Sequence, residues 1–135
     1  MADKFTVLLA EGFEEIEATG TIDVLRRAEL DLTIASINDE HEVTGSHGMR
    51  IGADCGISDV QPDALSLVAM PGGMPGSRNL AESQPVMQLL KKVYQNGNYV
   101  AAICAAPLAL HAAGLIEGAT ITAYPAINDQ LTGCT

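Results

Sequence analysis

The segment YVAAICAAP, residues 99–107, decides the fold expected for this chain. Its short apolar run predicts a buried strand, and Cys104 falls where that strand must give way to a helix. Alanines on both sides of the sulfur allow a sharp turn, so we expect the thiol to point outward near the positive end of the next helix dipole. That field favours the thiolate, which is the nucleophilic and oxidisable form. We therefore interpret Cys104 as a reactive thiol rather than an inert cysteine of the core.

Strands and helices alternate along the rest of the sequence. Apolar runs predict strands at residues 5–10, 30–37, 66–70 and 120–123, and helices are expected at about residues 14–28, 84–96 and 105–113. Residues 42–53, which several glycines interrupt, are expected to hold short strands. This alternation indicates an α/β fold with a mostly parallel sheet that helices cover on both faces.

The functional site is expected beyond the carboxyl ends of the strands, where open α/β sheets bind their ligands. Residues 11–17, residues 71–76 and Cys104 each follow a predicted strand. These three segments lie far apart in the sequence, and they should meet around one small site.

The sequence ends without a helix that could pair with the last predicted strand. A sheet of this type normally needs one more strand or helix to cover its edge. We therefore expect residues 1–135 to form a single domain that is C-terminally truncated, or one whose edge is covered by a partner.

The composition restricts the partners and the location. The 135 residues include 17 acidic and 7 basic ones, a formal net charge of −10 that argues against nucleic acid or an anionic membrane as a partner. The chain shows no secretory leader and no apolar run approaching about 20 residues, so a cytoplasmic location is expected. Three cysteines without a CxxC pair indicate neither a disulfide framework nor a zinc site.

Two other segments carry groups that could act on Cys104. Glu17 stands with Glu14 and Glu15 at the start of the first helix, where acidic residues also complement the helix dipole without any further role. Held beside a cysteine, Glu17 could donate a hydrogen bond to the thiolate or act as a general acid and base. The loop PGGMPG, residues 71–76, lacks the spacing of a phosphate-binding loop. Its backbone amides could serve an oxyanion, or it could be only a tight turn.

The histidines and the other cysteines carry no clear chemical signal. His41, His47 and His111 are each interpreted as surface or packing residues, so a Cys–His dyad of the protease type is not supported. Cys55 is interpreted as a loop or edge thiol, and Cys134 has no assignable role.

Three motifs together resemble the DJ/ThiJ/PfpI superfamily: AEGFEEIE at residues 10–17, MPGG at 70–73 and AAICAAP at 101–107. The resemblance is to the branch of the Parkinsonism-associated deglycase and its bacterial ThiJ-like relatives. It implies a flavodoxin-like three-layer sandwich that forms homodimers, with Cys104 on a strained nucleophile elbow and Glu17 hydrogen-bonded to its thiol. It also implies an anion-binding or oxyanion pocket formed by backbone amides, namely those of Gly72, Gly73 and Ala105.

The resemblance further implies an activity on small reactive carbonyls, of the glyoxalase III or deglycase type, without a metal or cofactor. Cys104 would be the nucleophile, and Glu17 would donate and accept the protons. The alternative is an oxidative-stress sensor or redox-regulated chaperone, in which Cys104 is oxidised to a sulfinic acid.

The sequence departs from the family in three ways. Tyr124 stands where family members often place a histidine near the thiol; a tyrosine can contact a substrate oxygen, but it is a poor base near neutral pH. Ala105 stands where the protease branch has a histidine, so proteolysis is not expected. Family members also continue for several tens of residues beyond the position of Thr135.

Overall fold

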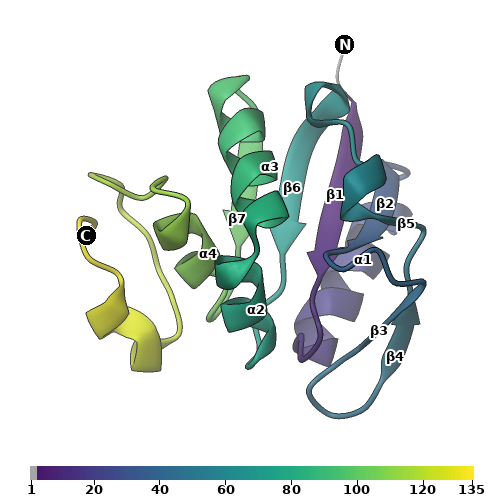
Figure 1. Cartoon of the computed structure of the whole chain (residues 1–135), viewed down its shortest axis with the longest axis horizontal. Coiled ribbons are helices and arrows are strands. Elements are labelled where there is room, and N and C mark those ends of the chain that lie inside the picture. The colour runs from purple at the N-terminus through teal and green to yellow at the C-terminus, as the bar shows by residue number, and fades with distance from the viewer. Residues whose placement is uncertain (1–2) are drawn as a thin grey trace.

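The structure, a computed structural model, describes residues 3–135 (Figure 1). Its centre is a sheet with the strand order β5-β2-β1-β6-β7, in which every neighbouring pair is parallel. The strands are β1 (Lys4–Leu9), β2 (Asp31–Ser36), β5 (Cys55–Gly56), β6 (Leu65–Met70) and β7 (Tyr99–Ala102). The mostly parallel sheet predicted from the sequence is therefore confirmed.

Helices cover both faces of this sheet. Helix α1 (Glu15–Arg27) lies on one face, and α2 (Gly76–Glu82), α3 (Gln84–Gln95) and α4 (Pro107–Ala112) lie on the other (Figure 1). Successive side chains of β1 point to opposite faces of the sheet. Val7 and Leu9 pack in the hydrophobic core under α1, whereas Leu8 packs in the hydrophobic core under α3. The apolar runs of the sequence follow from this burial on both faces. No helix within residues 3–135 is long and apolar enough to cross a membrane.

Smaller elements complete the described chain. The antiparallel hairpin of β3 (Glu42–Thr44) and β4 (Arg50–Gly52) confirms the short strands expected at residues 42–53. Three short 3-10 helices are η1 (Ile57–Asp59), η2 (Pro62–Ala64) and η3 (Pro125–Gln130). A third, small hydrophobic core forms where Ile127 and Leu131 pack with Ile116 and Ala105.

The strand predicted at residues 120–123 is wrong. The Ile121 N–H donates to the Thr135 carbonyl at 2.8 Å, and the Thr135 N–H donates to the Ala119 carbonyl at 2.9 Å, so the last residues of the chain pair with each other. Only the Tyr124 N–H reaches the end of β7, where it donates to the Cys104 carbonyl at 2.7 Å. This segment therefore meets the sheet at one point instead of extending it.

Helix α2 has no counterpart in the sequence prediction. The glycines that precede it indicate a turn, and Leu80 is its one large buried side chain, so an apolar periodicity is hard to recognise. The helix expected at residues 105–113 is also shorter than predicted, because it begins at Pro107.

Strand β7 forms one edge of the sheet, and the described residues place no strand on its outer side. Tyr99 and Ile103, two large apolar side chains at this edge, remain exposed. That the domain is truncated, or that a partner covers its edge, stays a prediction. The unpaired edge of β7 is the structural feature related to it.

Truncation of Leu90 tests the core between the sheet and α3. Leu90 is 0% exposed, so Leu90→Ala should lower the free energy of unfolding by about 2–5 kcal/mol through lost burial and a cavity. Tyr94 on the same helix is 54% exposed, and Tyr94→Ala should change that free energy by at most about 0.5 kcal/mol. Urea unfolding followed by circular dichroism measures both, and equal losses would contradict this placement of α3.

Candidate active site

Cys104 occupies a sharp turn between β7 and α4. Its φ angle is +61°, a left-handed conformation that costs free energy in a residue with a side chain. Hydrogen bonds hold both sides of the turn, since the Ile103 N–H donates to the Met70 carbonyl at 3.3 Å and the Ala106 N–H donates to the Ile103 carbonyl at 2.9 Å. The half-buried thiol thus lies beyond the carboxyl ends of β6 and β7, as the sequence predicts.

Glu17 reaches this thiol from the first turn of α1. Its side chain hydrogen-bonds to Cys104, and its Oε1 accepts the Gly72 N–H at 2.8 Å. A Cβ atom on Gly72 would lie 2.6 Å from Glu17 Oε1 and 2.8 Å from Cys104 Cβ, so a glycine is required there. The structure therefore brings together the three segments that the sequence analysis places at one site.

The electrostatics of Cys104 differ from the sequence expectation. Burial raises the pKa of the Cys104 thiol, the negative charge of Glu17 and its hydrogen bond raise it further, and Glu14 adds to this; only the Ala105 N–H lowers it. The expectation that the thiolate is favoured is therefore wrong. Helix α4 has only 6 residues and begins at Pro107, and burial together with two carboxylates raises the pKa of Cys104 in spite of it. The thiol is thus the dominant form near neutral pH.

The other predicted site residues surround the same turn. The Gly72 N–H is engaged by Glu17, whereas the Ala105 N–H bonds to the Cys104 sulfur. Gly73 follows with a φ of +92° and packs against the backbone of Glu14. Tyr124 is tied to Cys104 through its backbone, and its side chain is exposed. The anion pocket and a substrate contact of Tyr124 stay predictions.

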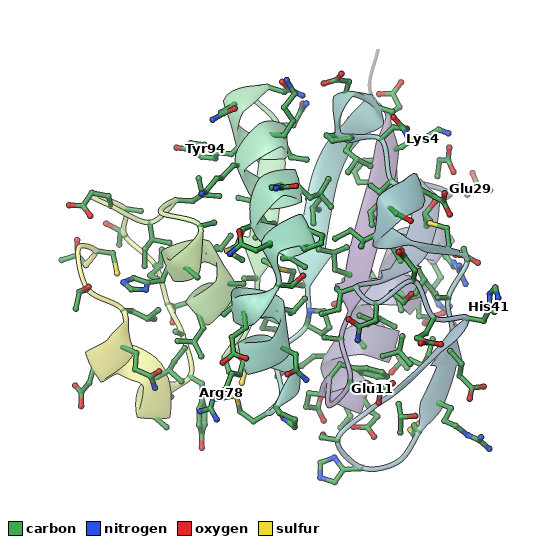
Figure 2. All side chains as sticks on the ribbon, viewed as in Figure 1. Lys4, Glu11, Glu29, His41, Arg78 and Tyr94 are labelled. Atoms are coloured by element: carbon green, nitrogen blue, oxygen red, sulfur yellow. The ribbon has the colours of Figure 1, made fainter. Side chains whose placement is uncertain are left out.

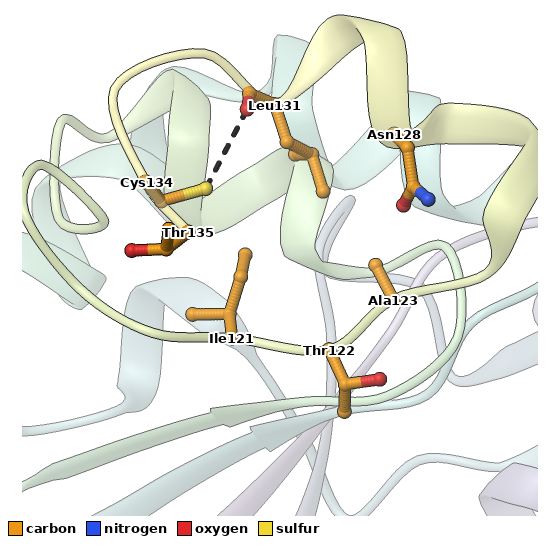
Figure 3. Close-up of a pocket in the computed structure, with 7 residues that line it drawn as sticks. All are labelled: Ile121, Thr122, Ala123, Asn128, Leu131, Cys134 and Thr135. Atoms are coloured by element: carbon orange, nitrogen blue, oxygen red, sulfur yellow. Dashed lines mark hydrogen bonds between the residues drawn. The ribbon is translucent and has the colours of Figure 1, made fainter.

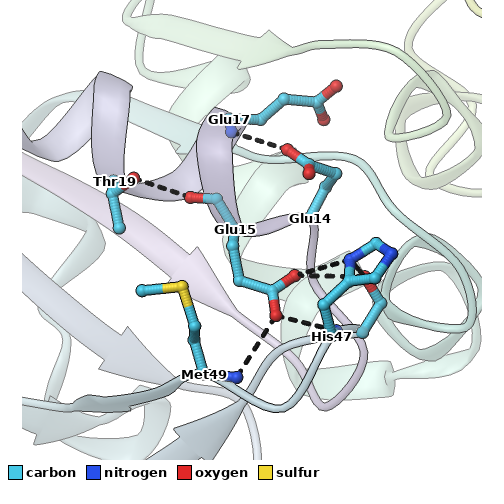
Figure 4. Close-up of polar contacts among 7 residues, drawn as sticks. Glu14, Glu15, Glu17, Thr19, His47 and Met49 are labelled. Atoms are coloured by element: carbon cyan, nitrogen blue, oxygen red, sulfur yellow. Dashed lines mark hydrogen bonds and ion pairs between the residues drawn. The ribbon is translucent and has the colours of Figure 1, made fainter.

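A cluster of Glu14, Glu15 and His47 beside this site was not predicted from the sequence. Figure 4 shows the two glutamates at the start of α1 and His47 in the loop between β3 and β4. One ligating atom from each residue lies within 4.8 Å of the others. The adjacent acids were visible in the sequence, but their approach to a histidine more than thirty positions away depends on the tertiary fold.

Glu15 anchors this loop to α1. It is 5% exposed, and its Oε2 accepts the backbone N–H of His47 at 2.7 Å and that of Met49 at 3.3 Å (Figure 4). Burial by itself raises the pKa of Glu15, but these backbone hydrogen bonds and one from the His47 side chain together lower it. Gly45 packs against the Glu15 carboxylate, where a Cβ would lie 2.5 Å from Glu15 Cδ. We assign the ionised Glu15 to loop anchoring.

A cavity lies near the C-terminus, in the segment whose Tyr124 N–H donates to the Cys104 carbonyl. It has a volume of about 280 Å³ and includes Ile121, Leu131 and Cys134 in its lining (Figure 3). The Cys134 Sγ donates to the Leu131 carbonyl at 3.5 Å. Neither Cys104 nor Glu17 lines this cavity. We therefore identify the candidate site by its reactive side chains and not by the size of a cavity.

The fold and the cysteine elbow define a class, the flavodoxin-like α/β proteins with a thiol on a strained turn beside a glutamate. The chain belongs to the DJ-1/PfpI family, whose family model matches residues 3–135. This finding confirms the resemblance stated from the three sequence motifs.

Named relatives agree with this assignment. The crystal structure of DJ-1beta from Drosophila melanogaster superimposes with a TM-score of 0.93 at 37% identity and covers 99% of this chain and 72% of that chain. Protein DJ-1 homolog B of Arabidopsis thaliana is 39% identical over 132 residues, which are 97% of this chain but only 30% of the relative. A protein named as a deglycase in Pyrococcus abyssi is 30% identical over 125 residues, covering 93% of this chain and 74% of that protein.

Removing the Glu17 charge should make the Cys104 thiol more acidic. Glutamine can keep the hydrogen bonds of Glu17 but carries no charge, so Glu17→Gln should lower the pKa of Cys104 from its raised value towards the ordinary 9.0. The rate of Cys104 alkylation by iodoacetamide against pH, read by mass spectrometry, measures this. Glu11→Gln is the control and should leave the curve unchanged; a Glu17→Gln pKa equal to or above the wild-type one would refute the explanation.

Glu15 should stabilise the fold except in acid. Because its folded pKa is lowered, its contribution is complete above the ordinary value of 4.5 and is lost as the pH falls below it. Glu15→Gln should therefore be less stable than the wild type at pH 7, and the difference should shrink below pH 4.5. Urea unfolding at several pH values measures this, with Glu82→Gln as an exposed control. A difference independent of pH would show that the Glu15 charge is not involved.

Proposed function

We propose that this protein is a cysteine-dependent enzyme that acts on small reactive carbonyls, of the glyoxalase III or deglycase type. The observation that carries the proposal is the hydrogen bond between the Glu17 carboxyl group and the Cys104 thiol on a strained turn. The name of the Pyrococcus abyssi relative, a deglycase, supports the same substrate class. The proposal extends to the whole protein, although the chain spans only part of its relatives.

The raised pKa of Cys104 makes Glu17 the general base of the first step. The sulfur attacks the aldehyde carbon of a 2-oxoaldehyde such as methylglyoxal, and a C–S bond forms. The thiol proton passes to the Glu17 carboxylate, and the carbonyl π electrons become a lone pair on oxygen. Glu17 then returns the proton to that oxygen, which gives a hemithioacetal.

The second half of the reaction is an internal redox exchange. Glu17 removes the proton from the former aldehyde carbon, and an enediolate forms with its negative charge on the oxygen of the neighbouring carbon. The hydroxyl proton on the former aldehyde carbon passes to that oxygen, and Glu17 returns its proton to the neighbouring carbon, which gives a thioester. Water hydrolyses the thioester to lactate and regenerates the thiol. One carbon is oxidised and its neighbour reduced, so the sequence of steps needs water but no redox cofactor.

The Ala105 amide supports the mechanism from the other side of the turn. A backbone N–H aimed at the reacting centre stabilises negative charge without reorganisation. In the resting site this N–H bonds to the Cys104 sulfur, so it lies close to where the oxyanion would form. Gly73 and the Tyr124 hydroxyl are the further groups that we propose for substrate binding.

We also propose that the protein works as a homodimer in the cytoplasm. Ile16 and Val24 are exposed apolar side chains on α1, and Met49 is a third on the loop that Glu15 anchors to this helix. Such an apolar surface is typical of an interface. All three cysteines are free thiols, which suits a reducing compartment.

Lactate formation from methylglyoxal tests the function. Cys104→Ala should abolish it, and Glu17→Gln should slow it by about 10²–10⁴-fold because proton transfer is lost. The same Glu17→Gln variant should be alkylated faster, because its Cys104 thiol ionises more readily. A slower turnover in that variant would therefore come from the lost proton transfer and not from poorer ionisation of the thiol. Cys134→Ala is the control and should remain active.

Lactate formation that survives Cys104→Ala would overturn the proposal. A wild-type protein that forms no lactate but gains two oxygens at Cys104 in dilute peroxide would instead favour the redox sensor, the second candidate function. The half-buried thiol with an amide N–H on its sulfur is the observation that favours this alternative.

A further inference from the structure

Another cavity lies between the central sheet and residues 57–64, the segment that holds η1 and η2. Its volume is about 150 Å³, and its polar lining comes from Lys4, Thr6, Thr33, Cys55, Asp59 and Gln61. Lys4 lies at the amino end of β1, whereas Glu11 follows the carboxyl end, where the candidate active site lies (Figure 2). Cys104 does not line this cavity, which is therefore separate from the candidate active site.

Thr6 carries the most informative group of this cavity. It is 1% exposed, and its hydroxyl makes no hydrogen bond within the described residues. A buried hydroxyl normally has a partner, because leaving it unpaired costs free energy. The Oγ of Ser77 is also without a partner but is completely enclosed, whereas Thr6 lines a cavity. The Thr6 hydroxyl is thus a buried donor and acceptor with room beside it for a partner.

Thr33 places a second hydroxyl beside the first. The parallel strands β1 and β2 pair Thr6 with Thr33, so both side chains point to the same face, on strands about 4.8 Å apart. Thr33 is half-buried, and its side chain likewise makes no hydrogen bond within residues 3–135. Cys55 adds a thiol from β5, whose pKa burial raises and nearby acids raise further, so it is neutral. The cavity thus presents three neutral hydrogen-bonding groups.

The outer wall of the cavity is held at both ends. The Ser58 N–H donates to Asp39 Oδ1 at 3.0 Å, and Asn96 Nδ2 donates to Asp63 Oδ1 at 3.0 Å. These contacts fix residues 57–64 to the loop after β2 and to the end of α3. The cavity is therefore formed by the fold and is not a gap beneath a loose loop.

The size and charge of the lining define the class of molecule that fits. A cavity of about 150 Å³ is large enough for one organic molecule of about the size of benzene, or for several waters. Lys4 and Asp59 are exposed and bring opposite charges to the rim, so neither an anion nor a cation is favoured. Val60 and Leu65 add apolar surface that suits a short carbon chain.

We propose that this cavity binds a small neutral polyhydroxy molecule of about the size of glycerol. The hydroxyls of Thr6 and Thr33 exchange hydrogen bonds with those of the ligand, and its carbon chain packs against Val60 and Leu65. The inference concerns a second site and does not rest on the proposed function of Cys104.

Titration with glycerol, followed by the backbone amide signals in nitrogen–proton correlation NMR spectra, tests the site. The signals of Thr6, Thr33 and Cys55 should shift and saturate, with a Kd of about 10 mM for so small a ligand. Thr6→Val and Thr33→Val keep the shape of the side chain but remove the hydroxyl. Each should raise the Kd, read from the Cys55 signal, about threefold to tenfold. Thr21→Val is the matched control on α1; it lies outside the cavity and should leave the Kd unchanged.

Two further measurements separate binding from structure. Propionate and propylammonium, which are charged molecules of similar size, should cause no saturating shift of these signals. In urea unfolding, Thr6→Val should be at least as stable as the wild type, because the Thr6 hydroxyl has no partner to lose among the described residues.

Glycerol that causes no saturating shift at Thr6 and Thr33 would leave the cavity to water alone and overturn the proposal. Thr6→Val and Thr33→Val variants that bind glycerol as tightly as the wild type would also overturn it, as would tighter binding of either charged molecule. A marked loss of stability in Thr6→Val would show that its hydroxyl is bonded within the fold, which contradicts the basis of the proposal. None of these results bears on lactate formation at Cys104, so the proposed function stands or fails separately.

Discussion

The candidate site depends on one carboxylate that joins three segments of the chain. Glu17 comes from α1, accepts the Gly72 N–H from the loop after β6, and hydrogen-bonds to Cys104 after β7. None of these contacts is local, so each requires the parallel sheet that brings the carboxyl ends of neighbouring strands to one edge. The close fit around Gly72 makes the arrangement intolerant of any larger residue.

This carboxylate also affects how readily the Cys104 thiol ionises. Burial and two nearby acids raise the pKa of Cys104, so the site does not store a free thiolate. It holds a thiol that hydrogen-bonds to a carboxylate. In the mechanism that we propose, that carboxylate would accept the thiol proton as the sulfur attacks a carbonyl carbon.

Much of this architecture could be predicted from the sequence because its signals are local. Residues 5–10 form a mostly apolar run, and apolar side chains recur through residues 30–37; the strands β1 and β2 lie within these two segments apart from one residue of β1. The turn at Cys104 follows from a strand that ends among alanines. The position of the segments after the strands predicts that they meet, but the role of Glu17 stays open until the family resemblance assigns it.

What could not be predicted depends on long-range contacts or on a balance of opposing effects. Residues 120–123 are as apolar as a short strand, but Ile121 finds its partner in Thr135. The cluster of His47 with Glu14 and Glu15 arises because a loop folds onto α1. The pKa direction of Cys104 could not be read from the helix that follows it, because burial and the neighbouring acids decide it.

The backbone hydrogen bond from Tyr124 to the Cys104 carbonyl has a mechanical consequence. The left-handed backbone of Cys104 would relax if nothing restrained it, and part of that restraint comes from outside the strand and helix on either side. The segment after α4 restrains the Cys104 turn through this hydrogen bond, so cleavage between α4 and Tyr124 would loosen the turn without removing Cys104 or Glu17. The conformation of Cys104 thus depends on the chain that follows α4.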